Sequence, residues 1–315
     1  MRDAAKNKKP GSKPLLSVLL PVLNGNDTIR DAIESLINQD FKDFEILVID
    51  GGSTDGTYEI VNEYQRNDPR LKLYKKDIGL GDSLNFLLRI AKGSFSARMD
   101  ADDISLPSRF SSQIDLLKAR KDVVLVGTQI SYIVGDKVIT RTPYSCDHLK
   151  IVSDLENGIF SLAHPSIMFR TDDAISVGGY RETGIGEDLQ FFLDLSQKGK
   201  LANTDNVGLL YRYSPGSITS DPTKAEMIEM RYAYTLKKWH SNNDSLSFKE
   251  FSNEWKSRPR FKKVTSWFGR KGNFLYFKYL IHHERQPFLS YFFLILSAFC
   301  KPHAVLRHLK RRLPV

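Results

Sequence analysis

Cysteine is scarce in this chain, and long apolar segments are missing from it. The 315 residues include two cysteines, Cys146 and Cys300, which are too few and too isolated for a disulfide framework or a zinc site. This scarcity is typical of a protein from a reducing compartment. The uncharged run at residues 288–300 has 13 residues, whereas a helix needs about 20 to cross a bilayer. With 41% apolar and 26% charged residues, the composition is that of a globular protein.

A secretory signal peptide is not expected either. Basic residues do precede the apolar run at residues 15–23, but Pro21 interrupts the run and no small-residue cleavage site follows it. We therefore expect a first core strand at this position. Residues 1–14 before it are basic and polar, and we expect them to form a disordered tail.

Positive charge gathers near the C-terminus. The net charge of the chain is +9, and residues 240–315 hold 15 Lys or Arg against 4 Asp or Glu. After Pro302, leucines at positions 306, 309 and 313 alternate with basic residues, which is typical of a helix lying in a membrane interface. The alternative is a helix packed on the core with a solvated basic face. We expect residues 221–315 to form a helical extension, basic and apolar, that associates with an anionic membrane surface.

The first hundred residues alternate between strand and helix patterns. Apolar runs at residues 16–20, 45–49 and 95–99 predict strands, and the apolar spacing over residues 28–37 predicts a helix. Near-continuous apolar strands that alternate with helices predict an α/β fold, with a mostly parallel sheet flanked by helices. Such sheets bind ligands at the carboxyl ends of their strands. The residues at the expected strand ends are Pro21, Asp50 and Asp100.

Three carboxylates crowd together directly after the strand expected at residues 95–99. Asp100, Asp102 and Asp103 would repel one another, so they need a compensating positive charge. Mg²⁺ or Mn²⁺ would supply it, since these ions bind one or two carboxylates together with substrate phosphates. The alternative is a solvated acidic turn in which Asp103 caps the next helix.

Six short motifs occur in a fixed order between residues 15 and 220. They are SVLLPV (17–22), VIDGGSTDGT (48–57), ARMDADD (97–103), GGY (178–180), GED (186–188) and YR (211–212). This ordered set resembles the inverting GT-A glycosyltransferases of family 2, of the bacterial type that builds cell-surface polysaccharides, lipopolysaccharides or glycolipids.

The resemblance implies a fold, an activity and a location. It implies a Rossmann-like GT-A domain over residues 15–220, with a nucleotide-sugar half at about 15–105 and an acceptor half at about 106–220. It implies a metal-dependent transferase that moves a sugar from a nucleotide-sugar donor, a UDP-sugar favoured, to a glycan or lipid-linked saccharide by a single displacement. Together with the basic C-terminal segment, it implies a cytoplasmic protein bound peripherally to the inner face of the cell membrane.

Site residues follow from the resemblance position by position. Asp100 and Asp102 match the metal-binding Asp-x-Asp, with Asp102 as the direct ligand of Mn²⁺ or Mg²⁺ and Asp100 reaching the ribose or the metal. Asp188 matches the catalytic base, with Glu187 beside it, although acidic residues also suit any first helical turn. The implied donor-binding residues are Pro21, Val22, Asn24, Asp50, Gly51, Arg98, Asp100, Ala101 and Arg212.

Several positions have plainer explanations or depart from the family pattern. Arg98 suits an ion pair with a neighbouring Asp as well as it suits a diphosphate contact, and a lone histidine such as His164 is more often structural. Gly51 stands where a second Asp is usual, which removes a polar contact to the nucleotide. Ser214 stands where a His is usual, and a serine would assist a metal or diphosphate less strongly.

Two other functions remain alternatives at this point. A non-catalytic protein of the same fold that binds a membrane or nucleic acid would explain the basic C-terminal segment. However, the uniformly apolar run at residues 288–300 does not suit a nucleic-acid groove, so we expect no nucleic-acid partner. A nucleotidyltransferase would show a Gly-rich basic loop after the first strand, and residues 20–29 contain none.

Overall fold

The computed structural model describes residues 13–135, 137–140, 143–181, 186–213, 222–242 and 245–257. Ser214, the expected domain boundary near residue 220, and the apolar and basic segments after residue 257 lie outside the described residues. The described part divides into two compact units. The first runs to Ile133 and continues from Thr140 to Arg212, and the second contains Val134–Ile139 and the described residues from Tyr213 onward. Within the described residues, no helix combines the length and apolar character needed to cross a membrane.

The first half of the sheet is parallel. Strands β1 (Leu16–Val22), β2 (Phe44–Asp50), β3 (Leu71–Lys75) and β4 (Phe95–Arg98) pair in the order β3-β2-β1-β4. β1 and β2 are buried along their whole length, as their continuous apolar runs predict. β1 is therefore central, with β2 and β3 on one side of it and β4 on the other.

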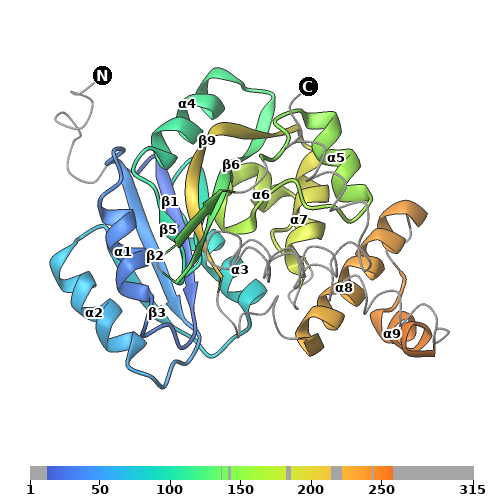
Figure 1. Ribbon diagram of the computed structural model, residues 1–315, viewed down its shortest axis with the longest axis horizontal. Coiled ribbons are helices and arrows are strands. Elements are labelled where there is room, and N and C mark those ends of the chain that lie inside the picture. The colour runs from blue at the N-terminus through green and yellow to red at the C-terminus, as the bar shows by residue number, and fades with distance from the viewer. Residues whose placement is uncertain are drawn as a thin grey trace, which may run out of the picture. The chain divides into compact units, whose positions relative to one another are not determined.

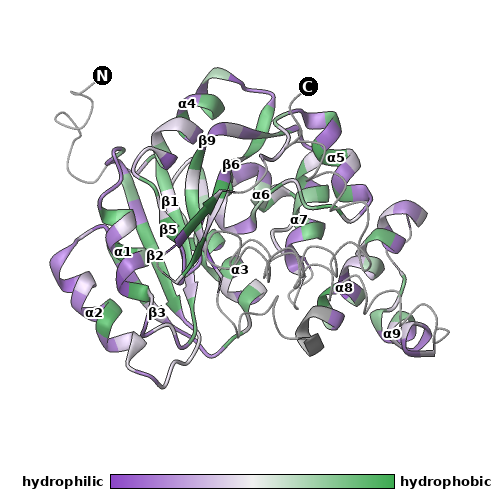
Figure 2. Cartoon of the chain, in the orientation of Figure 1, coloured by the Kyte–Doolittle hydropathy of each residue, from purple (hydrophilic) through white to green (hydrophobic). Residues whose placement is uncertain are grey.

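Helices cover both faces of this parallel half. α1 (Ile29–Ile37) and α2 (Thr57–Asn67) lie on one side of the strands and α3 (Leu80–Ile90) lies on the other (Figure 1). Strand–helix–strand crossovers are right-handed, so the reversal in the direction of strand addition after β3 moves α3 to the opposite face. Figure 2 shows hydrophobic strands between helices that are hydrophobic on one side only. The predicted α/β architecture is confirmed.

The second half of the sheet mixes strand directions. β8 (Met168–Arg170) runs antiparallel to β4, followed by β6 (Val123–Val134), β9 (Lys200–Arg212) and the short β5 (Ile104–Ser105). β6 continues past the polar residues at its middle, where its register against β9 shifts. The remaining strand, β7 (Lys137–Thr140), pairs with β6.

The other helices connect this half or belong to the second unit. The first group consists of α4 (Arg109–Ala119), α5 (His148–Glu156), the 3₁₀ turn η1 (His164–Ser166), α6 (Thr171–Ser176) and α7 (Glu187–Ser196). In the second unit, α8 (Pro222–Ser241) packs on α9 (Phe248–Ser257) through aromatic rings. Tyr234 contacts the rings of Phe248 and Phe251, and its hydroxyl donates to the Leu246 carbonyl at 2.7 Å.

The amino edge of the parallel strands is closely packed around Gly93. A Cβ atom placed on Gly93 would lie 2.6 Å from the backbone of Leu16 and Ser17. The Gly93 N–H also donates to the Ser17 hydroxyl at 2.9 Å, and its carbonyl accepts from Thr171 at 2.7 Å. No side chain fits here without separating β1 from the turn before β4.

We expect Gly93→Ala to destabilise the first unit, because overpacking of this kind costs about 1–3 kcal/mol or more. The thermal unfolding midpoint should fall by several degrees. Gly51→Ala is the matched control, since a Cβ there meets its nearest atom, the Val22 carbonyl oxygen, at 3.5 Å. An unchanged midpoint for Gly93→Ala would contradict the packing described for this edge.

Candidate active site

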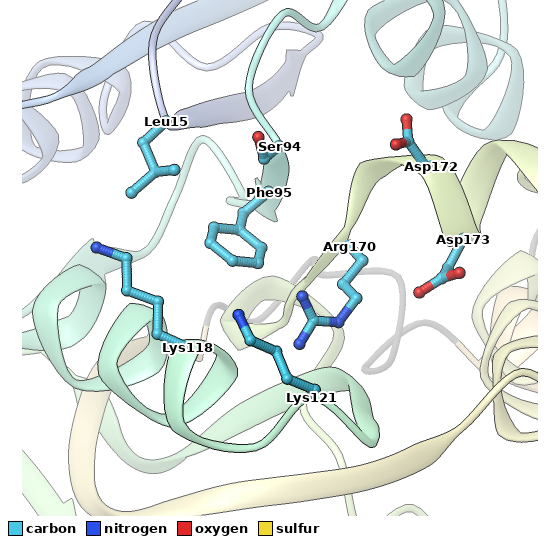
Figure 3. A pocket seen from close by; sticks show the side chains of 8 residues that line it. All are labelled: Leu15, Ser94, Phe95, Lys118, Lys121, Arg170, Asp172 and Asp173. Atoms are coloured by element: carbon cyan, nitrogen blue, oxygen red, sulfur yellow. The ribbon is translucent and has the colours of Figure 1, made fainter.

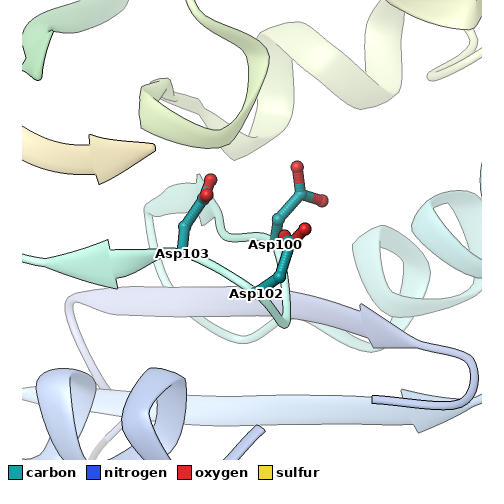
Figure 4. A group of neighbouring side chains, drawn as sticks. All are labelled: Asp100, Asp102 and Asp103. Atoms are coloured by element: carbon teal, nitrogen blue, oxygen red, sulfur yellow. The ribbon is translucent and has the colours of Figure 1, made fainter. Parts of the chain in front are cut away.

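Three carboxylates meet in the loop between β4 and β5. Oxygen atoms of Asp100, Asp102 and Asp103 all lie within 4.8 Å of one another, and Figure 4 shows the three side chains rising from this single loop. Asp103 is buried, while Asp100 and Asp102 are partly exposed. β4 and β1 are the neighbours at which the order of strand addition reverses, and open α/β sheets bind ligands at such a point.

The three carboxylates destabilise one another in their charged form. Burial and the charge of Asp100 raise the pKa of Asp102 to about 6. Burial, followed by the charges of Asp100 and Asp102, raises the pKa of Asp103 well above its usual range. In addition, Oδ2 of Asp103 is buried and finds no hydrogen-bond partner among the residues that the structure describes. An unpaired buried carboxylate oxygen and a set of oxygen ligands fit a hard divalent cation such as Mg²⁺ or Mn²⁺.

Arg98 is the cation closest to this loop. Its two terminal nitrogens each lie 2.5 Å from an oxygen of Asp100, and its side chain is only 4% exposed. Burial alone would lower the pKa of Arg98, but the charge of Asp100, smaller contributions from Tyr180 and Glu187 and the hydrogen bond to Asp100 together offset this effect, so the pKa is raised and the guanidinium stays protonated. The ion pair with a neighbouring Asp, one of the two interpretations of Arg98 drawn from the sequence, is present.

Arg212 closes the acidic loop from the end of β9. Its backbone N–H donates to Asp103 Oδ1 at 2.8 Å, and its Nε donates to the Asp102 carbonyl at 2.8 Å. A terminal nitrogen pairs with Asp31 at 3.0 Å. Asp103 therefore holds β9 and does not cap the following helix, which begins after Ser108. That alternative from the sequence is wrong.

Asp50 ends β2 as a buried carboxylate with one free oxygen. Its Oδ1 accepts from the N–H groups of Gly52 and Ser53 at 2.8 and 2.7 Å. Its Oδ2 is buried and has no hydrogen-bond partner within the described residues. Because an unmade buried hydrogen bond costs about 1–3 kcal/mol, this oxygen is suited to accept an N–H from a ligand.

The remaining donor-site candidates lie on loops next to Asp50. Asn24 adopts a left-handed conformation, with φ of 52°, and its side chain accepts from the Thr54 N–H at 2.9 Å. Pro21 and Val22 end β1, and the Val22 carbonyl accepts from the Gly51 N–H at 2.8 Å. Ala101 lies across from this loop, because a Cβ on Gly25 would be 3.8 Å from the Ala101 Cβ. These positions therefore share one edge of the sheet.

Glu187 and Asp188 open helix α7. Gly186 precedes them with φ of 92°, a conformation that glycine adopts most readily. Glu187 is buried and Asp188 is partly exposed. Burial, followed by the charge of Asp188, raises the pKa of Glu187 to about 7, and the charges of Arg98 and Asp100 also act on it. The start of α7 and the acidic loop are thus within electrostatic reach of each other.

His164 links Glu187 to a third side chain. Its Nε2 lies 3.0 Å from the hydroxyl of Tyr180, and its Nδ1 lies 3.7 Å from Oε1 of Glu187. In the sequence, Tyr180 stands out only as part of the GGY motif, and Asp31 does not stand out at all. Neither residue has a local signal, because each meets its partner only after distant segments pack together.

The cavity shown in Figure 3 is a separate feature. It has a volume of about 450 Å³ and is lined at the amino ends of β1 and β4 by Leu15, Phe95 and Lys118, among others. Arg170, which also lines it, donates to the carbonyls of Leu117 and Val123. The cavity therefore lies at the edge opposite Asp50 and Asp100 and contains none of the expected site residues.

Comparison with solved structures defines the class of fold. Staphylococcus aureus TarS in complex with UDP-GlcNAc superposes with a TM-score of 0.59 at 19% identity, covering 91% of this chain and 92% of that chain. Mannosyltransferase PcManGT from Pyrobaculum calidifontis, in complex with GDP-Man and Mn²⁺, gives 0.56 at 16% identity, covering 97% and 78%. The fold is that of the GT-A glycosyltransferases, as predicted.

Sequence comparison defines the family. The model of "Glycosyl transferase family 2" matches residues 17–177, about half of the chain, and the chain belongs to this family. One relative is the UDP-Glc:alpha-D-GlcNAc-diphosphoundecaprenol beta-1,3-glucosyltransferase WfaP of Escherichia coli, 29% identical over 226 residues, 67% of this chain and 82% of WfaP. The predictions of the family and of a glycosyltransferase enzyme are confirmed.

We expect Asp102→Asn to stabilise the metal-free protein at pH 8. Folding raises the pKa of Asp102 to about 6. Above that pH the folded protein therefore contains an ionised carboxylate in an unfavourable environment, which lowers the free energy of unfolding, and Asn removes this cost. The unfolding midpoint in EDTA should rise by about 2–4 °C at pH 8 and by less at pH 5, where the wild-type carboxyl is already protonated.

Mn²⁺ provides the second half of this test. It should raise the unfolding midpoint of the wild type and fail to do so for Asp102→Asn. Asp115→Asn, on the exposed face of α4, is the control and should match the wild type in both conditions. A loss of stability for Asp102→Asn in EDTA at pH 8 would mean that ionised Asp102 has a favourable partner.

Proposed function

We propose that this glycosyltransferase moves a sugar from a nucleotide-sugar donor, a UDP-sugar favoured, to a glycan or lipid-linked saccharide acceptor. The transfer depends on Mn²⁺ or Mg²⁺ and inverts the anomeric centre by a single displacement. The observation that carries this proposal is the group Asp100, Asp102 and Asp103 at the carboxyl edge of the parallel strands. Complexes of TarS with UDP-GlcNAc and of PcManGT with GDP-Man and Mn²⁺ support it.

The acidic loop is suited to hold the metal. Two oxygen ligands of one Mg²⁺ ion, each at about 2.0–2.1 Å, can lie up to roughly 4.2 Å apart. The carboxylate oxygens here lie within 4.8 Å, so small side-chain rotations bring Asp102 and Asp100 to a common ion. When bound, such a cation neutralises negative charge on the diphosphate leaving group. Arg212, which contacts this loop, adds positive charge on the same side.

The nucleotide would bind beside this loop. The unpartnered Oδ2 of Asp50 would accept an N–H from the nucleobase. Pro21, Val22 and Asn24 would form the wall against which the base lies. Gly51 leaves open space next to it, since a Cβ at Gly51 would meet no atom closer than 3.5 Å.

Asp188 would act as the general base. A sugar hydroxyl is a poor nucleophile, so a carboxylate must take its proton as the oxygen attacks. Asp188 is partly exposed at the start of α7, where it is accessible to an acceptor, whereas its neighbour Glu187 is buried. Attack from the face opposite the diphosphate inverts the anomeric centre without a covalent sugar–enzyme intermediate, in contrast to retaining chemistry.

A donor screen tests the proposal. UDP-, GDP- and dTDP-sugars are incubated with the protein in Mn²⁺, in Mg²⁺ and in EDTA, and the release of nucleoside diphosphate is measured. A UDP-sugar should be hydrolysed or transferred in the presence of metal only. Asp188→Asn should lower kcat by about 10²–10⁴-fold while the Kd for the donor is unchanged, and Asp115→Asn serves as control. Wild-type turnover by Asp188→Asn would reject its role as base.

We also propose that the protein acts at the inner face of the cell membrane. The proposal is supported by the 15 Lys or Arg and 4 Asp or Glu of residues 240–315 and by the lipid-linked substrate that the name of WfaP specifies. Full-length protein should float with liposomes that contain anionic lipid, and a chain that ends at Gln286 should not. Equal flotation of both chains would show that residues 287–315 do not hold the protein on the membrane.

A further inference from the structure

A buried chain of polar groups lies behind the proposed base and has no part in the roles assigned so far. It consists of Glu187, His164 and Tyr180, which are 5%, 8% and 0% exposed. Tyr180 stacks on Phe191 with ring centroids 4.2 Å apart, and the His164 ring packs edge-on against Phe192. These contacts hold the imidazole and the phenol in place inside the aromatic core under α7.

Contacts among these three side chains indicate which of their atoms carry protons. His164 Nε2 lies 3.0 Å from the Tyr180 hydroxyl. Burial and the charge of Arg98 lower the pKa of His164 well below its usual range, so the imidazole is neutral and has one N–H. If Nε2 carries that hydrogen and donates to Tyr180, Nδ1 has a lone pair that faces Oε1 of Glu187.

The environment of Glu187 favours its neutral form. Asp188 repels a charge on Glu187 from the same helix, and Asp100 does so from the loop after β4. Arg98 on β4 is the attractive charge, but it is already paired with Asp100. His164 and Tyr180, which face Glu187 from η1 and from the segment before α7, are both uncharged. Burial disfavours a second carboxylate ion at this position.

We propose that Glu187 is a neutral carboxylic acid that donates a hydrogen bond to Nδ1 of His164, and that this pair positions Asp188 as the ionised carboxylate at the start of α7. The inference rests on the proposed function, since it assigns Asp188 the role of base. Glu187 and His164 are positioning residues and touch no reacting atom. The 3.7 Å between Oε1 and Nδ1 must shorten by about 0.7 Å for a hydrogen bond, and such contacts often tighten only in the substrate complex.

The proton balance of the step is simple. As the acceptor oxygen bonds to the anomeric carbon and the bond to the diphosphate breaks, the hydroxyl proton passes to Asp188 and then to solvent. Glu187 keeps its own proton throughout. Loss of that proton would leave two adjacent carboxylate ions and would break the hydrogen bond to His164, so the geometry of the base would be lost.

The pH dependence of Glu187→Gln is the decisive measurement. The wild-type kcat should fall as the pH rises past about 7, the pKa of Glu187. The Gln amide can donate to His164 as the neutral acid does, so Glu187→Gln should keep kcat within about threefold of wild type at pH 6.5 and lack the alkaline fall. Glu59→Gln, on the exposed face of α2, is the matched control and should retain the fall.

Two results would overturn the inference. One is a Glu187→Gln profile with the same alkaline fall as wild type. The other is a Glu187→Gln variant as inactive as Asp188→Asn at every pH, which would make ionised Glu187 part of the chemistry. If Glu187→Gln does not fold, His164→Phe tests the same idea. Loss of the acceptor Nδ1 should move the fall to lower pH by about 0.5–1 unit, and an unmoved fall would contradict the pairing.

Infrared spectroscopy separates this inference from the proposed function. The difference spectrum between wild type and Glu187→Gln at pH 6.5 should contain the C=O band of a protonated carboxylic acid, and that band should disappear by pH 9. This measurement needs no donor or acceptor. A protein without activity toward any nucleotide sugar would reject the transfer reaction and leave the band intact, whereas an active protein without the band would reject the neutral Glu187.

Discussion

Four carboxyl groups, Asp100, Asp102, Asp103 and Glu187, experience the charge of one buried guanidinium, that of Arg98. Its position follows from the sheet, because it is the last residue of β4, and β4 lies between β1 and β8. Arg212 adds a second positive charge that acts on Asp102, and Arg109 interacts with the charge of Asp103. Burial and repulsion from neighbouring carboxylates nevertheless raise the pKa of Asp102 to about 6 and that of Glu187 to about 7.

The strand order explains why these groups meet. β1 to β3 are added in one direction and β4 is added on the other side of β1, so the loops after β1 and β4 diverge at one point of the sheet edge. β8 then runs antiparallel beside β4 and brings the turn His164–Ser166 to the same side. Residues far apart in sequence thereby come to one side of the sheet, as the Arg212 contacts with Asp102 and Asp31 show directly.

The parallel half and the acidic loop were predictable from sequence because their signals are local. A continuous apolar run followed by Asp50 or Asp100 indicates both a strand and its end. The contacts of Tyr180, Asp31 and Arg212 were not predictable in this way. Arg212 meets Asp102 and Asp31 only when segments more than a hundred residues apart pack together. Tyr180 and His164 are 16 residues apart, which is still too far for a local sequence pattern to indicate their contact. The continuity of the strand Val123–Val134 is likewise not evident from sequence, because the polar residues at its register shifts resemble a loop.

The buried pair of Arg98 and Asp100 is better understood as an organising contact than as a source of stability. Removing two charges from water costs free energy that their attraction offsets only in part, and Arg98 Nε has no partner in the described part of the chain. Arg98 acts electrostatically on the carboxylates of the acidic loop and on Glu187 at once. A change of charge near Asp100 therefore also changes the electrostatic environment at the start of α7, so the acidic loop and the first turn of α7 are coupled through Arg98.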